Sequence, residues 1–201
     1  MPVKRLADAK SRLGGPGSWI PDELRPRLAL AFAADSVEAA LRAELVAEVI
    51  VVTNDDDAAR VLGALGARIV PDEPDAGLNP ALAYGARIAV EKFGAVGIAA
   101  FAADLPALRS EELDAVLGSV TGGRFYVPDA HDVGTTMLFA APGCDLDPRF
   151  GGASGLAHAA SGAVAVTGLE IRSLRRDVDT PQDLAEAVTL GVGPRTGVLL
   201  A

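Results

Sequence analysis

The chain has 201 residues, half of them hydrophobic and 4% aromatic, and carries a formal net charge of −9 at pH 7. This length suits a single domain, and the negative charge argues against a nucleic-acid groove, because phosphate backbones are bound by basic surfaces. The single cysteine, Cys144, excludes an intrachain disulfide. The sequence has neither an apolar run of about 18 residues nor an apolar signal segment, so we expect a cytoplasmic protein.

Helical and strand patterns alternate along the chain. Only Met1–Val3 precede the first basic residues, so the first strand of a sheet is expected to be very short or to begin upstream of Met1. The patterns then predict, in chain order, a helix over 21–41 that is interrupted or restarted near Pro26, a strand at 48–53, a helix over 55–66, a strand at 67–71, a helix over 79–94, a strand at 96–102, a helix from 110 to about 117, strands at 124–128, 135–140 and 164–167, and a final helix that ends at Gly191.

Residue types that favour helix starts mark three of these boundaries. Asn79 and Ser110 are candidate caps for the helices that follow them. Before the last helix, Thr180, Pro181 and Asp183 form a pattern that resembles a capping box, with Asp in place of the usual Glu. We therefore expect the last helix to start at Pro181.

The alternation indicates an α/β fold with a mainly parallel sheet that is covered by helices on both faces. In such sheets, ligands bind beyond the carboxyl ends of the strands. No linker, internal repeat or low-complexity segment divides the sequence, so residues 1–201 are expected to form one domain.

An aspartate follows the most apolar run of the chain. In "VGIAAFAADLPAL", residues 96–108, eight apolar or Gly residues lead to Asp104. An isolated buried carboxylate is costly, so Asp104 is expected to leave the strand at its carboxyl end, where a ligand would bind. The alternative is a turn or helix-capping aspartate that needs no metal.

A second acidic pair lies in "RRDVDTP". Alternate residues of an extended segment face the same side, so the carboxylates of Asp177 and Asp179 should point together and repel unless a cation lies between them. With Asp104 they form a three-carboxylate site that suits Mg²⁺, which prefers oxygen ligands and keeps substrate phosphates in its coordination shell. The alternative is that Arg175 and Arg176 neutralise the pair, or that Asp179 caps the last helix.

The stretch "VKRLADAKSRLGG", residues 3–15, gathers Lys4, Arg5, Lys10 and Arg12 in an otherwise acidic chain. A flexible basic loop after a first strand can wrap a triphosphate. The stretch matches neither the P-loop pattern G-x-x-x-x-G-K-[ST] nor the dinucleotide pattern G-x-G-x-x-G. A solvated basic turn is the open alternative.

The stretch "FGGASGLAH", residues 150–158, places two glycines and a serine before a predicted helix. Free backbone amides at a helix start bind carboxylate or phosphate groups. The hydrolase pattern G-x-S-x-G needs Gly where the chain has Leu156. This departure disfavours a Ser-His-Asp site built from Ser154 with His158 or His131.

Taken in order, several segments resemble the guanylyltransferases of coenzyme F420 biosynthesis, the phosphoenolpyruvate or 2-phospho-L-lactate guanylyltransferase family. They are "PVKRLADAKSRL", "VVTNDD" with "GARIVPDEP", "GLNPAL", "ADLPAL", "GTTMLFA", "PRFGGASGLAH" and "DVDTPQDL", and they span nearly the whole chain. The opening and closing segments are the most specific, whereas "DLPAL" alone marks only a wider nucleotidyltransferase superfamily. The resemblance implies a single Rossmann-like domain of the nucleotide-diphospho-sugar transferase type.

The resemblance also implies a reaction in which GTP and a phosphorylated three-carbon acid lose pyrophosphate, so that the phosphate of the acid becomes joined to GMP. The implied roles are a metal and catalytic role for Asp104, metal binding for Asp177 and Asp179 with Mg²⁺ as cofactor, catalysis at the GTP phosphates for Lys10 and Arg12, nucleotide binding for Lys4, Thr53, Asn54 and Asn79, and acceptor binding for Thr136, Gly151 and Ser154.

Phosphoenolpyruvate is the expected acceptor, because the composition and "DPRFGGASGLAH" are similar to the actinobacterial branch of the family. 2-Phospho-L-lactate and 3-phosphoglycerate remain alternatives, since they differ from it only by small groups. An alternative from a different functional class is a non-catalytic, nucleotide-binding regulatory domain. The family also implies a labile product, which makes a downstream transferase of the pathway a candidate transient partner.

Overall fold

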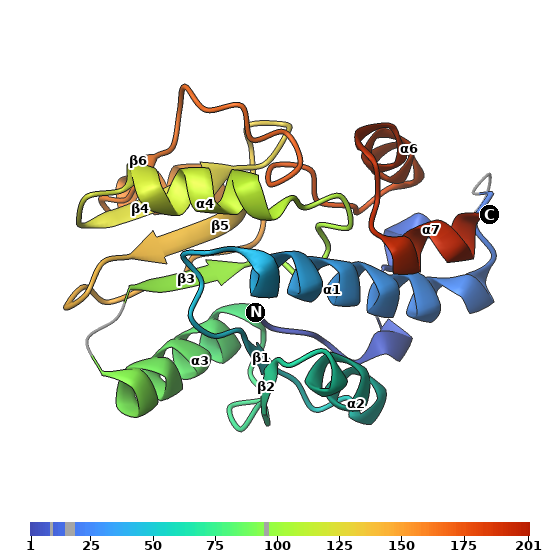
Figure 1. The fold of residues 1–201 in the computed structure, drawn as a ribbon, viewed down its shortest axis with the longest axis horizontal. Helices are drawn as coiled ribbons and strands as arrows, with labels where there is room; N and C mark the ends of the chain where they lie inside the picture. Colours follow the sequence, from blue (N-terminus) through green and yellow to red (C-terminus); the bar gives the residue numbers. More distant parts are fainter. Residues whose placement is uncertain (9, 15–18, 95–96) are drawn as a thin grey trace.

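The computed structural model describes residues 1–8, 10–14, 19–94 and 97–201, and Figure 1 shows their arrangement. Residues 9 and 15 of the basic stretch, and the predicted strand residue Val96, lie outside the described residues. The elements in chain order are η1 (Leu6–Asp8), η2 (Ser11–Leu13), η3 (Asp22–Leu24), α1 (Arg25–Arg42), β1 (Ile50–Val52), α2 (Asp56–Ala64), β2 (Arg68–Val70), α3 (Leu78–Phe93), β3 (Ile98–Phe101), α4 (Ser110–Ser119), β4 (Arg124–Pro128), β5 (Thr135–Ala140), α5 (Ser154–Ala160), β6 (Val164–Ala165), α6 (Pro181–Leu190) and α7 (Pro194–Leu200).

The strands form two sheets, in which β1 pairs with β2 and the order of the other strands is β3-β5-β4-β6. The α/β fold that the sequence predicts is present, with parallel pairing of β1 with β2 and of β4 with β6. β5 runs antiparallel to both of its neighbours. Its pairing with β4 must be antiparallel, because the two strands are joined only by residues 129–134, which are too few for a parallel crossover.

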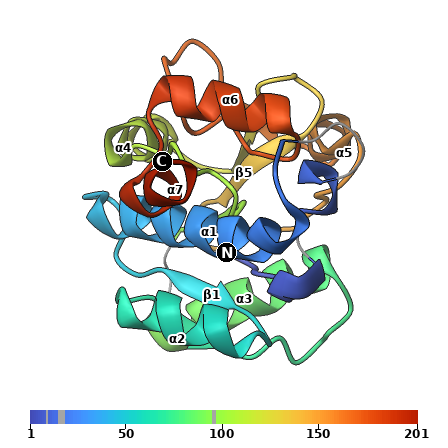
Figure 2. The same ribbon diagram turned by 90° about the vertical axis from the view of Figure 1, so that its right-hand side faces the viewer.

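The helices cover both faces of the larger sheet, as expected. Successive side chains of a strand point to opposite faces, and in β5 Met137 packs in one core cluster with Val37 of α1 and Leu113 of α4. The neighbouring Leu138 packs in a second cluster with Leu82 of α3. Figure 2 shows α1 running between α6 and α7 on one side and β1 with α2 and α3 on the other. No helix in the described part of the chain combines the length and apolar character that a membrane crossing requires.

The residues before the basic stretch pair with β1. Pro2 pairs in parallel with Val52 of β1, and the amides of Val3 and Val52 bond to the carbonyls of Val52 and Met1, both at 2.9 Å. Burial lowers the pKa of the Met1 amino group to about 5, and this group donates to the Ile50 carbonyl at 3.0 Å.

An apolar cavity of about 560 Å³ lies between β1 and β3. Its lining includes Ile50 and Val52 from β1, Ala99 and Phe101 from β3, and Leu113 from α4. Because β1 and β3 belong to separate sheets, the two halves of the fold are joined by side-chain packing around this cavity.

Two of the predicted helix caps are wrong. The N-cap of α3 is Gly77, whose φ of 101° is a conformation that Gly adopts without strain. The Asn79 side chain turns instead to the backbone of Phe150. Ser110 is the first residue of α4, and its N-cap, Arg109, makes no capping bond through its side chain.

The sequence patterns do not indicate α7, whose first turn bonds to a buried carboxylate of α1. Asp35 of α1 accepts hydrogen bonds from the amides of Arg195 at 3.2 Å and Thr196 at 2.9 Å. A Cβ at Gly193 would lie 2.4 Å from the carboxyl carbon of Asp35, so this approach requires glycine. The contact fixes the start of α7 against α1.

Asp35→Ala is expected to lower the free energy of unfolding by about 1–3 kcal/mol, because it leaves two backbone amides at the start of α7 without an acceptor. Urea unfolding followed by circular dichroism measures the change. The control Asp57→Ala removes an ion pair with Arg60 in which both side chains are exposed, and should cost about 0.5 kcal/mol or less. Equal losses in the two variants would contradict the anchoring role of Asp35.

Candidate active site

Asp104 leaves the sheet where the sequence predicts. After β3, the amide of Ala102 still bonds to the carbonyl of Thr136 at 2.9 Å. Leu105 is fully buried, and its amide donates to the Ser36 hydroxyl at 3.1 Å. Because the next residue is anchored in the core, the Asp104 side chain stays half-buried at the carboxyl end of the strand.

The segment that carries the acidic pair lies directly against Asp104. The amide of Val178 donates to the Asp104 carbonyl at 3.0 Å, and the Val178 side chain is fully buried. The flanking Asp177 and Asp179 are half-buried. Arg109 holds the N-cap position of α4, so Asp104 is not the cap of that helix.

Lys10 lies between two of these carboxylates. Its ammonium pairs with Asp104 and, at 3.0 Å, with Asp179, and only 12% of its side chain is exposed. Burial by itself would lower the pKa of Lys10, but the negative charges of Asp104 and Asp179 raise it above the ordinary value. Lys10 has a φ of 56°, and a non-Gly residue held in this region costs about 1–3 kcal/mol. The strained backbone of Lys10 therefore lies at the point where its ammonium group meets the carboxylates.

The cluster holds more negative charge than Lys10 balances. Burial raises the pKa of Asp177 to about 7, and the charges of Asp104, Asp179 and Asp129 add to this effect. One carboxylate oxygen of Asp104, Oδ1, is buried without a hydrogen-bond partner. Both features indicate that the cluster has room for a further cation or for protons.

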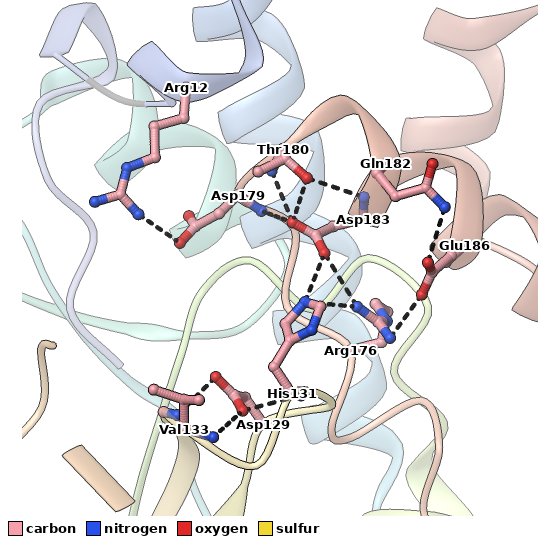
Figure 3. Close-up of polar contacts among 11 residues, drawn as sticks. Arg12, Asp129, His131, Val133, Arg176, Asp179, Thr180, Gln182, Asp183 and Glu186 are labelled. Atoms are coloured by element: carbon pink, nitrogen blue, oxygen red, sulfur yellow. Dashed lines mark hydrogen bonds and ion pairs between the residues drawn. The ribbon is translucent and has the colours of Figure 1, made fainter. Parts of the chain in front are cut away.

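Asp183 holds the backbone beside Asp179. One of its oxygens accepts from the amides of Asp179 at 3.3 Å and Thr180 at 2.8 Å, and the other contacts Arg176 and His131 (Figure 3). Burial would raise the pKa of Asp183, but the hydrogen bonds from Thr180 and His131 hold it below its ordinary value. The predicted capping box of α6 is confirmed, and its N-cap is Thr180 rather than Asp179.

The two arginines before the acidic pair do not neutralise it. Arg175 donates to carbonyl oxygens at the end of β4 and pairs with Asp132. Arg176 pairs with Asp183 at 3.0 Å and with Glu186 at 2.6 Å. Figure 3 shows instead that Arg12 reaches Asp179, at 3.7 Å, with 79% of its side chain exposed. The cations at the pair therefore come from the N-terminal basic stretch.

The glycine-rich loop before α5 is exposed, and its backbone makes turns that favour glycine. Gly151 and Gly152 have φ values of 106° and 54°, which favour glycine, and α5 begins at Ser154. The amide of Gly155 donates to the Val133 carbonyl at 3.0 Å, and a Cβ at Gly155 would lie 3.1 Å from that oxygen. The loop is thereby pressed against the loop between β4 and β5.

Two predicted substrate residues are engaged at the ends of their own strands. The Thr136 hydroxyl is fully buried and lies 3.5 Å from the Val127 carbonyl. The Thr53 hydroxyl accepts a hydrogen bond from the Asp55 amide at 3.1 Å. Their side chains thus support the strand ends.

The remaining predicted nucleotide residues either bond to different segments of the chain or are exposed. Asn54 exchanges two hydrogen bonds with the backbone of Asp72, both at 2.9 Å. Asn79 exchanges two with the backbone of Phe150, at 3.0 and 2.8 Å. Lys4 is exposed. Asn79 therefore contacts the glycine-rich loop and not the other three residues grouped with it.

The histidines do not form a Ser-His-Asp site. Nδ1 of His158 bonds to the Thr135 hydroxyl, and Nε2 accepts from the Arg149 amide, both at 2.9 Å. Both ring nitrogens are therefore used, and neither is left to activate Ser154. His131 contacts the capping carboxylate before α6 instead.

Asp55, which the sequence analysis does not single out, ties the basic stretch to the loop after β1. One oxygen caps α2 through the Ala58 amide, and the other accepts from the Leu6 amide, both at 2.9 Å. Its position between a predicted strand and a predicted helix is the sequence feature that could have identified it as a helix cap. The effect is to hold the start of the basic stretch beside Thr53 and Asn54.

Comparison with known proteins decides which family this geometry belongs to. The model of the MobA-like NTP transferase domain matches residues 12–166. The phosphoenolpyruvate guanylyltransferases of Salinispora arenicola and Thermomonospora curvata are each 54% identical to the chain, over 99% and 100% of it and 91% and 87% of their own lengths. That of Streptomyces coelicolor is 52% identical over 100% of the chain and 94% of its own length. The chain belongs to this guanylyltransferase family.

Membership of the guanylyltransferase family makes the chain a nucleotidyltransferase, and solved structures agree on the fold. A putative nucleotide-diphospho-sugar transferase of Desulfovibrio desulfuricans G20 matches with a TM-score of 0.60 at 14% identity, over 94% of each chain. A CMP:2-keto-3-deoxy-manno-octonic acid synthetase complexed with CTP matches with a TM-score of 0.53 at 15% identity, over 94% of this chain and 95% of that one. The predicted nucleotide-diphospho-sugar transferase fold is confirmed.

Enzymes of this wider family generally use a divalent metal ion. In the described part of the chain, no three His, Cys, Asp or Glu side chains already stand close enough to hold an ion. The donors around Lys10 nevertheless suit a hard cation, because Asp104 has a buried oxygen without a partner, and burial and neighbouring carboxylates raise the pKa of Asp177 although Lys10 opposes them.

Proposed function

We propose that the chain transfers GMP from GTP to phosphoenolpyruvate. A phosphate oxygen of the acceptor attacks the α-phosphorus of GTP, the bond from that phosphorus to the β-phosphate oxygen breaks, and pyrophosphate leaves. The product is enolpyruvyl-2-diphospho-5'-guanosine, an intermediate for coenzyme F420. The near alternative is the same reaction on 2-phospho-L-lactate or 3-phosphoglycerate, because these acceptors differ only by small groups.

One observation carries the proposal, namely the meeting of Lys10, Asp104 and Asp179 at the carboxyl end of β3. Residues from near the start, the middle and near the end of the sequence converge there, and the carboxylates outnumber the ammonium group that lies between them. The named activity of relatives that are 54% identical over nearly the whole chain supports the same reaction. A non-catalytic regulatory domain would not require this cluster.

Mg²⁺ is the cation that suits an all-oxygen donor set in contact with phosphates, and Asp104, Asp177 and Asp179 would hold it. When bound, it would neutralise charge on the phosphates of the two substrates. Lys10 and Arg12 would supply positive charge to the triphosphate at the same cluster. Because the attacking phosphate is already an oxyanion, no general base is needed, and catalysis rests on positioning and charge neutralisation.

We assign the acceptor to the loop before α5. The backbone amides around Gly151 and Ser154, with the end of β5 at Thr136, supply donors for a phosphate and a carboxylate. We assign the nucleotide to the loop after β1, where Thr53 and Asn54 lie beside the basic stretch that contains Lys4. A labile product favours direct transfer to a downstream transferase, which we propose as a transient partner.

The reaction is tested by pyrophosphate release from GTP and Mg²⁺ with each of the three acids in turn, together with mass detection of the product. We expect release with phosphoenolpyruvate to exceed that with the other two acids by about tenfold or more, in line with the discrimination that small pockets achieve. If GTP binds but no pyrophosphate is released with any of the three acids, the regulatory-domain alternative is favoured. If pyrophosphate release is faster with 2-phospho-L-lactate, the reaction stands but 2-phospho-L-lactate is the acceptor.

A further inference from the structure

Two side chains from different elements hold neighbouring residues of the loop before α5. Asn79, in the first turn of α3, exchanges both of its amide hydrogen bonds with the backbone of Phe150, at 3.0 and 2.8 Å. His158, in α5, accepts from the amide of Arg149 at 2.9 Å. The two contacts grip consecutive peptide units just before the glycines.

His158 is built to serve as an uncharged acceptor. It is fully buried, its ring packs edge-on against Phe150 with 5.0 Å between the centroids, and its second nitrogen bonds to the Thr135 hydroxyl at 2.9 Å. Burial lowers the pKa of His158 to about 4, and the positive charges of Arg124 and Arg149 act in the same direction while Asp147 opposes them. At neutral pH the ring therefore keeps a free lone pair for the Arg149 amide.

Between these contacts and Gly155, whose amide bonds to the Val133 carbonyl, the two glycines have no side chains to hold them in place. Gly151 and Gly152 are exposed, and a Cβ added to either would meet nothing within 4 Å. A backbone with two consecutive left-handed glycines has many alternative shapes. An error of about 1 Å in the placement of a substrate can cost roughly 10²-fold in rate, so something must fix this loop before it can bind an anion productively.

We propose that Asn79 and His158 are positioning residues that together clamp Arg149 and Phe150, and so preset the shape of the acceptor loop from Gly151 to Ser154. This rests on the proposed function in assigning the acceptor to that loop. It replaces the expected role of Asn79 at the base and ribose of the nucleotide, because the amide of Asn79 already has both of its groups bonded to Phe150. The clamp uses one residue from each side of the loop.

The two roles of Asn79 predict opposite kinetics. Asn79→Ala should raise the KM for phosphoenolpyruvate about tenfold or more and leave the KM for GTP within about twofold, as expected when about 1.4 kcal/mol or more of binding is lost on one substrate only. Arg87→Ala is the control, because it removes an exposed ion pair with Glu91 on the same helix, and it should leave both KM values unchanged. A rise in the GTP KM alone for Asn79→Ala would overturn the clamp.

His158 is tested by rescue. His158→Gln places an amide oxygen near the position of Nε2 and can still accept from the Arg149 amide, whereas His158→Leu keeps the bulk without an acceptor. We expect the Leu variant to raise the acceptor KM, and the Gln variant to restore most of the loss at equal thermal stability. Equal kinetics for the two variants would overturn the role of His158 in the clamp.

A readout without substrates separates the clamp from the proposed reaction. Hydrogen exchange of the Arg149 and Phe150 amides should be about tenfold faster or more in His158→Leu and Asn79→Ala respectively, because each variant removes the acceptor of that amide. Unchanged exchange in both variants would overturn the clamp, whatever the kinetics show. Faster exchange in a protein that releases no pyrophosphate with any acid would keep the clamp and reject the reaction.

Discussion

Asp104→Asn is expected to lower the turnover number by about 10²–10³-fold, the loss seen when one group that stabilises transition-state charge is removed. The substitution keeps the size and shape of the side chain and removes one of the negative charges that would hold the cation against the phosphates. The fold should remain, because the anchors of this turn are the backbone of Asp104 bonded to Val178 and the buried Leu105. Steady-state pyrophosphate release and urea unfolding of the same preparation measure the two effects.

The stability of Asp104→Asn distinguishes a site residue from a structural one. Asp104 adds to the repulsion that raises the pKa of Asp177, so its neutralisation relieves strain while it loosens the ion pair with Lys10. We expect these effects to offset each other to within about 1 kcal/mol. Asp57→Asn, at an exposed ion pair on α2, serves as the control and should retain full activity. An unfolded Asp104→Asn whose folded fraction keeps its specific activity would show that the carboxylate serves the fold.

Local patterns were sufficient for the parts of this site that short segments determine. The apolar run before Asp104 predicts a strand that delivers a carboxylate to a strand end, and the structure has β3 there. The two-residue spacing of Asp177 and Asp179 predicts that they face one side with Val178 turned inward, and Val178 is fully buried. The capping box at Thr180 could also be predicted from the sequence, because all of its partners lie within four residues.

Contacts between distant segments could not be read from such patterns. Asn79 has the residue type and position of a helix cap, yet its partner is Phe150, 71 residues further along the chain. Asp35 gives no signal within α1 that it will hold the amides of α7 from 161 residues away. A polar side chain at a helix start satisfies either a local or a distant donor equally well, and only the packed fold selects between them.

The convergence of the carboxylates is an intermediate case. The sequence predicts three aspartates that belong to one site, but it does not predict which cation stands among them in the free protein. That cation is Lys10, brought from 94 residues before Asp104 and 169 before Asp179. Taken separately, the basic stretch and the acidic segments could each be ordinary solvent-exposed turns. They form a candidate site only because the fold brings them together.

Lys10→Met is expected to affect both turnover and stability. Turnover should fall by about 10²-fold or more, because the variant removes a positive charge that faces the developing charge on the phosphates. In a buffer that contains a chelator at pH 8, the free energy of unfolding should fall by about 1–3 kcal/mol, because the carboxylates lose a hydrogen-bonded counter-charge of which only 12% is exposed. Thermal unfolding and pyrophosphate release measure these changes, and Lys92→Met, at an exposed position near the end of α3, is the matched control.

The response of Lys10→Met to Mg²⁺ and pH decides whether a cation can take the place of the ammonium. The folded protein raises the pKa of Lys10 above its unfolded value near 10.5, so the stabilisation by Lys10 is complete below that value and is lost as the pH rises through the folded pKa. The deficit of the variant at pH 8 is therefore the full one. A cation that binds only the folded state stabilises by mass action, and Mg²⁺ should raise the unfolding temperature more in Lys10→Met than in the native protein, where the ammonium competes for the same oxygens. An equal or smaller response would mean that the metal does not share the oxygens that Lys10 holds.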